Sequence, residues 1–359
     1  MPVSVRSFAK INLGLRIGAR REDGFHDLLT VYQTIGLHDV IRVSAGRGSG
    51  IEIQCADPRV PRDESNTCYR IVEKAMLALQ AKGRVTIEIE KWLPVQGGLG
   101  GASSNAVAAL LGLERVLKKS LSAEERLRIA AEVGSDLPLF LLGGTVLGVG
   151  RGEQVYPLED LPGEACVVVT PEVGVSTPKA FAEWDRLCGA DALARDSGPP
   201  ANAARAVESS RPAGSETRPH TSSAAGTDQL TVENPSDRMN LLGRGLSAWL
   251  GEKYSGAPFR RGRRENPLFE LVRTGIQNDF EEVVFPEYPE LSEAKKALER
   301  TGAKYASLSG SGSTLYGLFA SKEAARLASA RLKKQSWNAQ ATVTLTRKQY
   351  WAKFLVSSF

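Results

Sequence analysis

A glycine-rich segment at residues 93–105 constrains the fold of this chain more than any other feature of its sequence. The segment reads Leu-Pro-Val-Gln-Gly-Gly-Leu-Gly-Gly-Ala-Ser-Ser-Asn, and it lies between the alternating stretch Val85–Ile89 and the apolar stretch Ala106–Leu117. Glycine allows positive φ angles and close approach of the backbone to a ligand. Free N–H groups at a helix start attract anions. We therefore predict a strand, a phosphate-binding loop and a helix in this order.

This loop differs from the two commonest phosphate-binding motifs. A Walker A loop needs a lysine after its last glycine, and none follows here. The dinucleotide fingerprint needs a third glycine where Ser103 follows Gly98 and Gly100. A flexible linker is the structural alternative, but two regular elements crowd the segment closely. The sequence thus indicates a nucleotide-binding loop of a rarer class.

Length, composition and charge narrow the class of protein. The chain has 359 residues, 42% of them hydrophobic, which favours two domains with packed cores. Its net charge of +5 suits an anionic substrate but is too weak to indicate nucleic-acid binding. No apolar run is long enough for a membrane span, and Met1–Lys10 lacks the apolar core of a signal peptide. The cysteines are widely spaced and the histidines scattered, so we expect reduced thiols, a cytoplasmic location and no histidine metal site.

Alternating and helical hydrophobic patterns follow one another along both halves of the chain. Strands are predicted at Val3–Ala9, Ile11–Ile17, Asp39–Val43, Gly50–Gln54, Val85–Ile89, Val146–Val149, Ala165–Thr170, Ala306–Leu308, Thr314–Phe319 and Ala341–Leu345. Helices are predicted at Asn66–Leu79, Ala106–Leu117, Glu124–Val133, Met239–Leu250, Leu268–Arg273, Leu291–Arg300 and Lys322–Lys334. This mixture indicates an α+β or mixed α/β architecture without fixing the order of the strands.

Residues 190–237 differ from the rest of the chain in composition. They are rich in Ala, Ser, Pro, Gly, Thr and Arg, contain almost no aromatic residue and show no hydrophobic period. Such a segment buries too little apolar surface to offset the entropy of ordering. We interpret it as a disordered surface insertion whose removal leaves the activity largely intact.

Several residues outside the loop allow both a structural and a functional interpretation. Lys10 and Asn12 share one face of a predicted strand, where a lone lysine is usually a solvent-facing edge residue. Asp136 follows a predicted helix, and a helix cap is the simpler interpretation of it. Phe25 and His26 lie in a turn, and such rings pack on a core more often than they stack on a base.

Two further segments carry the same ambiguity. The loop Ser309–Ser313 alternates serine and glycine, which suits either a tight turn or a second anion site. The basic cluster Arg260–Arg264 lacks neighbouring aromatic residues, so a solvated patch is favoured over nucleic-acid binding.

Three motifs in a fixed order resemble those of the GHMP kinases, the superfamily of galactokinase, homoserine kinase and mevalonate kinase. They are Ala9–Leu13, Pro94–Asn105 and Leu308–Ser313. Further segments are similar to one branch of that superfamily, whose acceptor is an alcohol linked to cytidine diphosphate. These segments are Arg20–Leu28, Gly134–Phe140, Gly174–Pro178 and Asn278–Glu281. The resemblance covers residues 3–181 and 278–345 and excludes the insertion.

The resemblance implies a two-domain α+β kinase with its active site between the domains. We expect an N-terminal domain at residues 1–165, with the ATP loop and the catalytic pair, and a C-terminal domain at residues 166–359. ATP is the implied phosphoryl donor. The residues expected to bind it are Pro94, Val95, Gln96, Gly97, Gly98, Leu99, Gly100, Gly101, Ala102, Ser103 and Ser104. Mg²⁺ is expected with the phosphates, and its protein ligands are unknown, with Ser104 as one candidate.

The resemblance also assigns the reaction to Lys10 and Asp136. Asp136 is expected to act as the base for the substrate hydroxyl, because an alcohol is a poor nucleophile. Lys10 is expected to hold Asp136 ionised and to stabilise the developing charge. The remaining chemistry of phosphoryl transfer is alignment and charge neutralisation.

The acceptor residues implied by the resemblance are Asn12, Phe25, His26, Thr177 and Phe181. The cytidine ring is expected to stack between Phe25 and Phe181, with His26 reading the base edge and Asn12 and Thr177 lining the pocket. The family usually has tyrosine where Phe25 stands, so stacking survives while a hydroxyl contact is lost.

Two departures and three alternatives accompany this interpretation. Gln96 and Ala102 replace small residues or glycine common in the family's loop, and Gln96 is expected to narrow the phosphate cradle.

The alternatives are another GHMP kinase of the homoserine or mevalonate type, a catalytically inactive relative that binds a ligand, and a nucleic-acid binder. The sequence leaves the oligomeric state open between monomer and homodimer.

Overall fold

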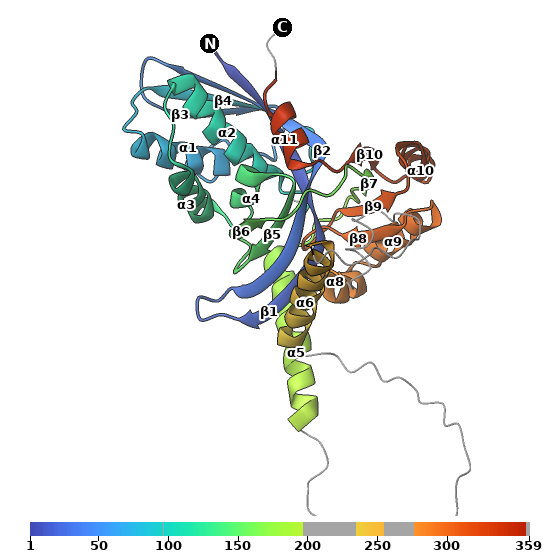
Figure 1. The fold of residues 1–359 in the computed structure, drawn as a ribbon. Helices are drawn as coiled ribbons and strands as arrows, with labels where there is room; N and C mark the ends of the chain where they lie inside the picture. Colours follow the sequence, from blue (N-terminus) through green and yellow to red (C-terminus); the bar gives the residue numbers. More distant parts are fainter. Residues whose placement is uncertain (96, 197–234, 255–275, 357–359) are drawn as a thin grey trace, which may run out of the picture.

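Two long antiparallel strands, β1 (Val3–Arg20) and β2 (His26–Gly46), run through the centre of the molecule (Figure 1). The computed structural model describes residues 1–95, 97–196, 235–254 and 276–356. The prediction of two short strands in place of β1 was wrong. Register shifts after Phe8 and after Asn12 absorb the irregular pattern, so the strand continues through Lys10.

The first sheet contains β1 and β2 and has the order β3-β4-β2-β5-β6, with β1 paired to β2. Its remaining strands are β3 (Gly50–Cys55), β4 (Arg84–Glu90), β5 (Thr145–Val149) and β6 (Gln154–Pro157). β3 and β4 are parallel, as the intervening helix requires, while the other pairs are antiparallel. Four helices pack with this sheet around one apolar core: α1 (Thr67–Ala78), α2 (Gly101–Leu117), α3 (Ala123–Val133) and α4 (Leu137–Leu142).

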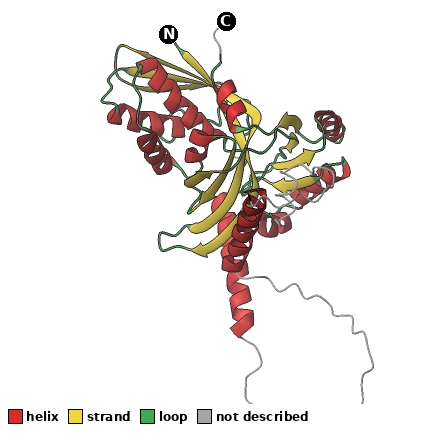
Figure 2. Cartoon of the chain, in the orientation of Figure 1, coloured by secondary structure: helices red, strands yellow, loops and turns green. Residues whose placement is uncertain are grey.

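The second sheet is fully antiparallel and has the order β10-β7-β9-β8. Its strands are β7 (Ala165–Val169), β8 (Tyr305–Leu308), β9 (Leu315–Phe319) and β10 (Ala339–Val343). Helices α8 (Phe280–Glu287), α9 (Pro289–Arg300) and α10 (Lys322–Lys334) cover it, and α10 has the bounds predicted from the sequence (Figure 2). The two sheets and the helices that pack on them confirm the predicted α+β class.

Three helices link the two halves. The C-terminal helix α11 (Arg347–Phe354) returns to the first sheet, where Tyr350 and Phe354 join the core that contains Phe8. Helices α5 (Thr177–Asp196) and α6 (Pro235–Tyr254) lie at the lower end of the long strands in Figure 1. Leu242 and Leu246 of α6 are buried in a core shared with β1 and β7.

The disordered insertion predicted at residues 190–237 begins too early. Residues 190–196 belong to α5, because a run of alanine, leucine and arginine suits a helix as well as it suits a loop. Residues 197–234, the predicted helix Leu268–Arg273 and the cluster Arg260–Arg264 lie outside the described residues. Among the helices that are described, none has the length and apolar character that crossing a membrane requires.

Candidate active site

The glycine-rich loop connects β4 to α2 and ends in a left-handed turn. Gly98 has φ +76° and Gly100 has φ +68°, a region that favours glycine. Helix α2 begins at Gly101 and not at the predicted Ala106, because Gly100 serves as its N-cap. No side chain of the described residues caps this helix start. Its first N–H groups are therefore available to an anion, as the sequence predicted.

A buried carboxylate, Asp39 of β2, holds the start of this loop in place. Its two oxygens accept hydrogen bonds from the Trp92 and Leu93 N–H groups, both at 2.7 Å. They also accept from Lys91 Nζ at 2.7 Å and from Asn105 Nδ2 of α2 at 3.0 Å. Asp39 thus ties both ends of the loop to the sheet. Nothing in its local sequence distinguishes it from an ordinary polar strand residue.

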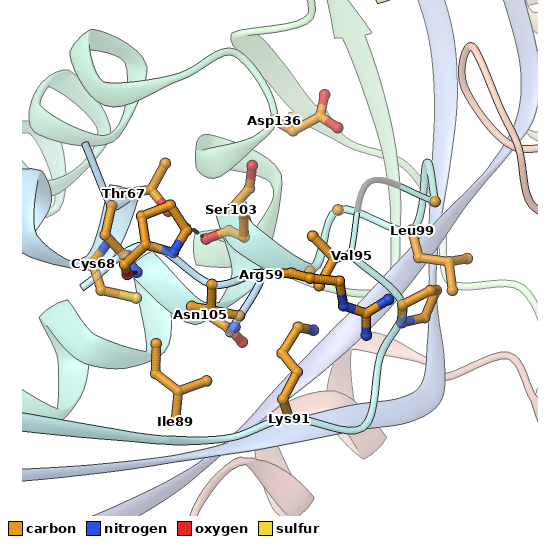
Figure 3. A pocket seen from close by; sticks show the side chains of 18 of the residues that line it. Arg59, Thr67, Cys68, Ile89, Lys91, Val95, Leu99, Ser103, Asn105 and Asp136 are labelled. Atoms are coloured by element: carbon orange, nitrogen blue, oxygen red, sulfur yellow. Dashed lines mark hydrogen bonds between the residues drawn. The ribbon is translucent and has the colours of Figure 1, made fainter. Parts of the chain in front are cut away.

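A pocket of about 400 Å³ opens between this loop, the end of β4 and the start of α1 (Figure 3). Most of the predicted ATP-binding residues line it: Pro94, Val95, Gly97, Gly98, Leu99, Gly100, Gly101, Ala102 and Ser103. Gln96 lies outside the described residues. Ser104 was also predicted to bind ATP, but it does not line the pocket. Its hydroxyl is buried against Ser7 Oγ.

Further residues line the pocket that the sequence did not indicate. They are Arg59, Val60, Pro61, Ser65, Asn66, Thr67, Cys68, Ile89, Lys91 and Asn105. Figure 3 shows Lys91 and Ile89 on the side of the pocket opposite Asp136. Burial raises the pKa of the Cys68 thiol to about 12, so this thiol stays uncharged. The added lining therefore combines apolar surface with two cationic side chains, Arg59 and Lys91.

Lys10 and Asp136 come together at the edge of this pocket. Lys10 Nζ lies 3.2 Å from Asp136 Oδ2, and the Lys10 side chain is buried while that of Asp136 is 31% exposed. Asp136 occupies the N-cap position of α4, as the simpler interpretation predicted, but its side chain makes no capping hydrogen bond and turns to Lys10 instead. Lys10 Nζ also donates to Asn12 Oδ1 at 2.7 Å, as expected for neighbours on one strand face. A half-exposed carboxylate beside a buried ammonium can accept a proton from a bound alcohol.

The second glycine-serine loop packs directly on the first. Ser309 Oγ donates to the Gly98 carbonyl at 3.0 Å, and the Thr314 N–H donates to the Gly97 carbonyl at 3.1 Å. Asn278 Nδ2 holds the loop from behind by donating to the carbonyls of Leu308 and Gly310. The second loop therefore braces the first glycine-rich loop with residues from the far half of the chain.

The predicted acceptor residues surround the end of β1 and the start of β2. The ring of His26 stacks on Phe181 with centroids 4.9 Å apart, and its Nε2 lies 2.7 Å from Asp185 Oδ1. Phe25 is 52% exposed and lies under the guanidinium of Arg151. Stacking of a base between Phe25 and Phe181 stays a prediction.

The two remaining acceptor residues also have polar partners. Thr177 Oγ1 lies 2.7 Å from Ser311 Oγ of the second loop. Asn12 Nδ2 donates to Thr30 Oγ1 at 2.8 Å. Together with the Lys10–Asn12 hydrogen bond, these contacts connect the predicted acceptor residues to Lys10 and to the second loop.

The described residues contain no group of three or more His, Cys, Asp or Glu side chains that could hold a metal ion. Ser104, the candidate magnesium ligand, is turned away from the pocket. Mg²⁺ often keeps several waters and binds mainly through substrate phosphates. The residues present fit that mode and do not form a protein cage.

Comparison with known proteins identifies family models for both halves of the chain. The model of the GHMP kinases N terminal domain matches residues 66–144, and that of the GHMP kinases C terminal domain matches residues 263–338. The first spans the glycine-rich loop and Asp136, and the second spans the Ser309–Ser313 loop.

Curated relatives cover nearly the whole chain. A 4-diphosphocytidyl-2-C-methyl-D-erythritol kinase of Solibacter usitatus is 33% identical over 320 residues, which is 89% of this chain and 82% of the relative. The kinase of the same name from Acaryochloris marina is 32% identical over 330 residues, covering 92% of this chain and 91% of the relative.

Solved structures with the same fold include close and distant relatives. A crystal structure of 4-(cytidine 5'-diphospho)-2C-methyl-D-erythritol kinase superimposes with a TM-score of 0.64 and 27% identity, covering 95% of this chain and 98% of that one. A mevalonate kinase gives a TM-score of 0.61 at 12% identity, over 96% of this chain and 99% of its own, which shows the shared fold alone.

Proposed function

Because this chain belongs to the 4-diphosphocytidyl-2-C-methyl-D-erythritol kinases, a family of GHMP kinases, we propose that Lys10 and Asp136 carry its phosphoryl transfer. The chain is an ATP-dependent small-molecule kinase. Its acceptor is the C2 hydroxyl of 4-diphosphocytidyl-2-C-methyl-D-erythritol, in non-mevalonate isoprenoid precursor biosynthesis. The observation that supports the catalytic roles is the 3.2 Å contact between Lys10 Nζ and Asp136 Oδ2 at the mouth of the nucleotide pocket.

In the proposed reaction, Asp136 takes the proton of the C2 hydroxyl. The hydroxyl oxygen then forms a bond to the γ-phosphorus of ATP, while the bond from that phosphorus to the bridging β–γ oxygen breaks and ADP leaves. Lys10 pairs with Asp136 before the step and offsets negative charge as it spreads over the transferred group. The N–H groups at the start of α2 bind the phosphates and align them with the acceptor.

The nucleotide is proposed to fill the pocket between the loop and α1. Its phosphates lie on the glycine loop, and its base and sugar lie toward Asn66, Thr67 and Ile89. Mg²⁺ accompanies the phosphates, with phosphate oxygens and water as ligands, and neutralises charge on the transferred group.

The acceptor is proposed to bind on the other side of the catalytic pair. Its cytosine stacks between Phe25 and Phe181, which requires the His26 ring to leave the face of Phe181 that it covers and to contact the base edge. Asn12 and Thr177 line the path from the base to Asp136. The polar contacts of these two residues with Lys10 and Ser311 support a continuous site.

The test is release of ADP with each acceptor, using the wild type and Asp136→Asn. We expect turnover with the cytidyl substrate and none with mevalonate or homoserine. Asp136→Asn lowers kcat by about 10²- to 10⁴-fold, the usual contribution of a general base. Asp160→Asn is the control, because Asp160 has a similar exposure of 29% and pairs with Arg347 away from the pocket. An Asp136→Asn enzyme with wild-type kcat would falsify the proposed base.

A further inference from the structure

Tyr32 of β2 contacts both members of the catalytic pair, and the sequence did not mark it. It pairs with Asn12 in the β1–β2 register, so its side chain lies on the same sheet face as Lys10 and Asn12. Its hydroxyl donates to Asp136 Oδ1 at 3.0 Å. The Lys10 ammonium lies 5.4 Å from the centre of its ring. The residue is 2% exposed, so these contacts are shielded from water.

Two glycines leave room for the Tyr32 ring. A Cβ at Gly148 of β5 would lie 2.5 Å from Tyr32 Cε2, and one at Gly152 would lie 2.5 Å from the Tyr32 hydroxyl oxygen. Real Cβ atoms do not approach so closely, so a side chain at either position would displace the phenol. The phenol is therefore confined where its hydroxyl meets Asp136.

The Tyr32 hydroxyl donates to Asp136 and does not act as a base. Burial raises the pKa of Tyr32 well above its usual value, and the negative charges of Asp136 and Glu153 raise it further. The charged groups that face Tyr32 are Lys10 from β1, Asp136 before α4 and Glu153 from the turn before β6. Tyr32 therefore keeps its proton throughout the working pH range and cannot compete with Asp136 as a base.

The two carboxylate oxygens of Asp136 therefore have different partners. Oδ2 faces Lys10 and Oδ1 accepts from Tyr32. An ionised carboxylate has about four lone-pair sites, so each oxygen keeps one for the acceptor hydroxyl. Two contacts from different strands fix the rotation of the carboxylate group, which a single contact would leave free.

We propose that Tyr32 is a positioning residue of the phosphoryl-transfer reaction, whose hydroxyl orients the Asp136 carboxylate toward the acceptor. The inference rests on the proposed role of Asp136 as the base. It deepens that role, because it explains how a partly exposed aspartate stays aligned with the acceptor.

The test is Tyr32→Phe, which removes the hydroxyl and keeps the ring. Steady-state kinetics with ATP and the cytidyl substrate are measured at one fixed pH. We expect kcat to fall about 3- to 10-fold, because a misaligned base costs rate, while both KM values stay within about twofold.

Tyr350→Phe is the matched control. Tyr350 is equally buried, and its hydroxyl donates to the Phe140 carbonyl at 2.8 Å without touching the catalytic pair. It should lose thermal stability like Tyr32→Phe but keep the wild-type kcat. An unchanged kcat in Tyr32→Phe, with Asp136→Asn inactive, overturns the inference and leaves the proposed function standing. An active Asp136→Asn enzyme overturns the proposed function, and the inference fails with it.

Discussion

Asp39 shows how one buried residue can set the geometry of a loop that it does not belong to. Its side chain is inaccessible to solvent and accepts four hydrogen bonds, two of them from the backbone at the start of the glycine loop. The other two come from Lys91 and Asn105, which line the nucleotide pocket. Charge-assisted bonds of this kind are short and directional. We therefore expect Asp39 to influence nucleotide binding through the backbone.

Replacing Asp39 with alanine should destabilise the protein and weaken ATP binding. The change leaves Lys91 as a buried cation without its carboxylate and two N–H groups without acceptors. The expected loss is about 3 kcal/mol in the free energy of unfolding, typical of breaking a buried pair. KM for ATP should rise several-fold while the KM for the cytidyl substrate changes little. Urea unfolding and steady-state kinetics measure the two effects.

Glu52→Ala is the control for that variant. Glu52 also pairs with a cation on a neighbouring strand of the same sheet, Arg84, but both side chains are exposed. Exposed pairs contribute little, so the free energy of unfolding should stay close to that of the wild type. Equal losses in the two variants would show that the buried network does not brace the loop.

At the scale of elements, the two glycine-serine loops interlock although they are far apart in the sequence. Gly98 of the first loop lies so close to the second that a Cβ there would be 2.2 Å from the Ser309 carbonyl oxygen. Its φ of +76° also disfavours any side chain. The cradle for the phosphates is thus shaped by backbone from both halves of the chain.

Gly98→Ala should push the two glycine-serine loops apart. Strain at positive φ costs about 1–2 kcal/mol, and the contact with Ser309 adds to it because a carbonyl cannot rotate away freely. We expect a larger loss of stability than in Gly302→Ala, which has φ +99° at the end of α9 but open space around it. Thermal unfolding compares the two, and ATP titration should show weaker binding in Gly98→Ala alone. Similar behaviour in both variants would rule out the contact as the cause.

The sequence predicted the elements well where hydrophobic period and caps agree, and less well where small residues predominate. Helix α10 was predicted with its full bounds, because Ser321 caps a regular amphipathic pattern. Helix α2 starts before its predicted first residue, since a Gly-Ala-Ser-Ser start carries no apolar period. Motif similarity brought Lys10 and Asp136 together correctly. Tyr32 was missed because its partner lies far along the chain, and a strand tyrosine has no distinctive spacing.

At the scale of the whole molecule, β1 and β2 connect the two halves and carry the site between them. Lys10 and Tyr32 lie on these strands, and Leu15 of β1 bridges to Asn278, which clamps the second loop. Helix α6 adds a second connection, because Arg238 pairs with Asp279 and Glu282 of the far half. The division into domains at residues 165 and 166 stays a prediction.

The described active-site residues all lie outside residues 197–234, which separate α5 from α6. Replacing this segment with a Gly/Ser linker of about 15 residues should therefore leave kcat and both KM values within about twofold, since such a linker is a flexible coil.

Arg238→Ala tests helix α6 itself, for which we expect a loss of stability. Its guanidinium is 11% exposed and lies over the Trp184 ring, so its removal should lower stability by about 1–3 kcal/mol. Thermal unfolding and ADP release are measured for both variants. If the linker variant loses activity while Arg238→Ala keeps it, the segment contributes to function and the helix does not.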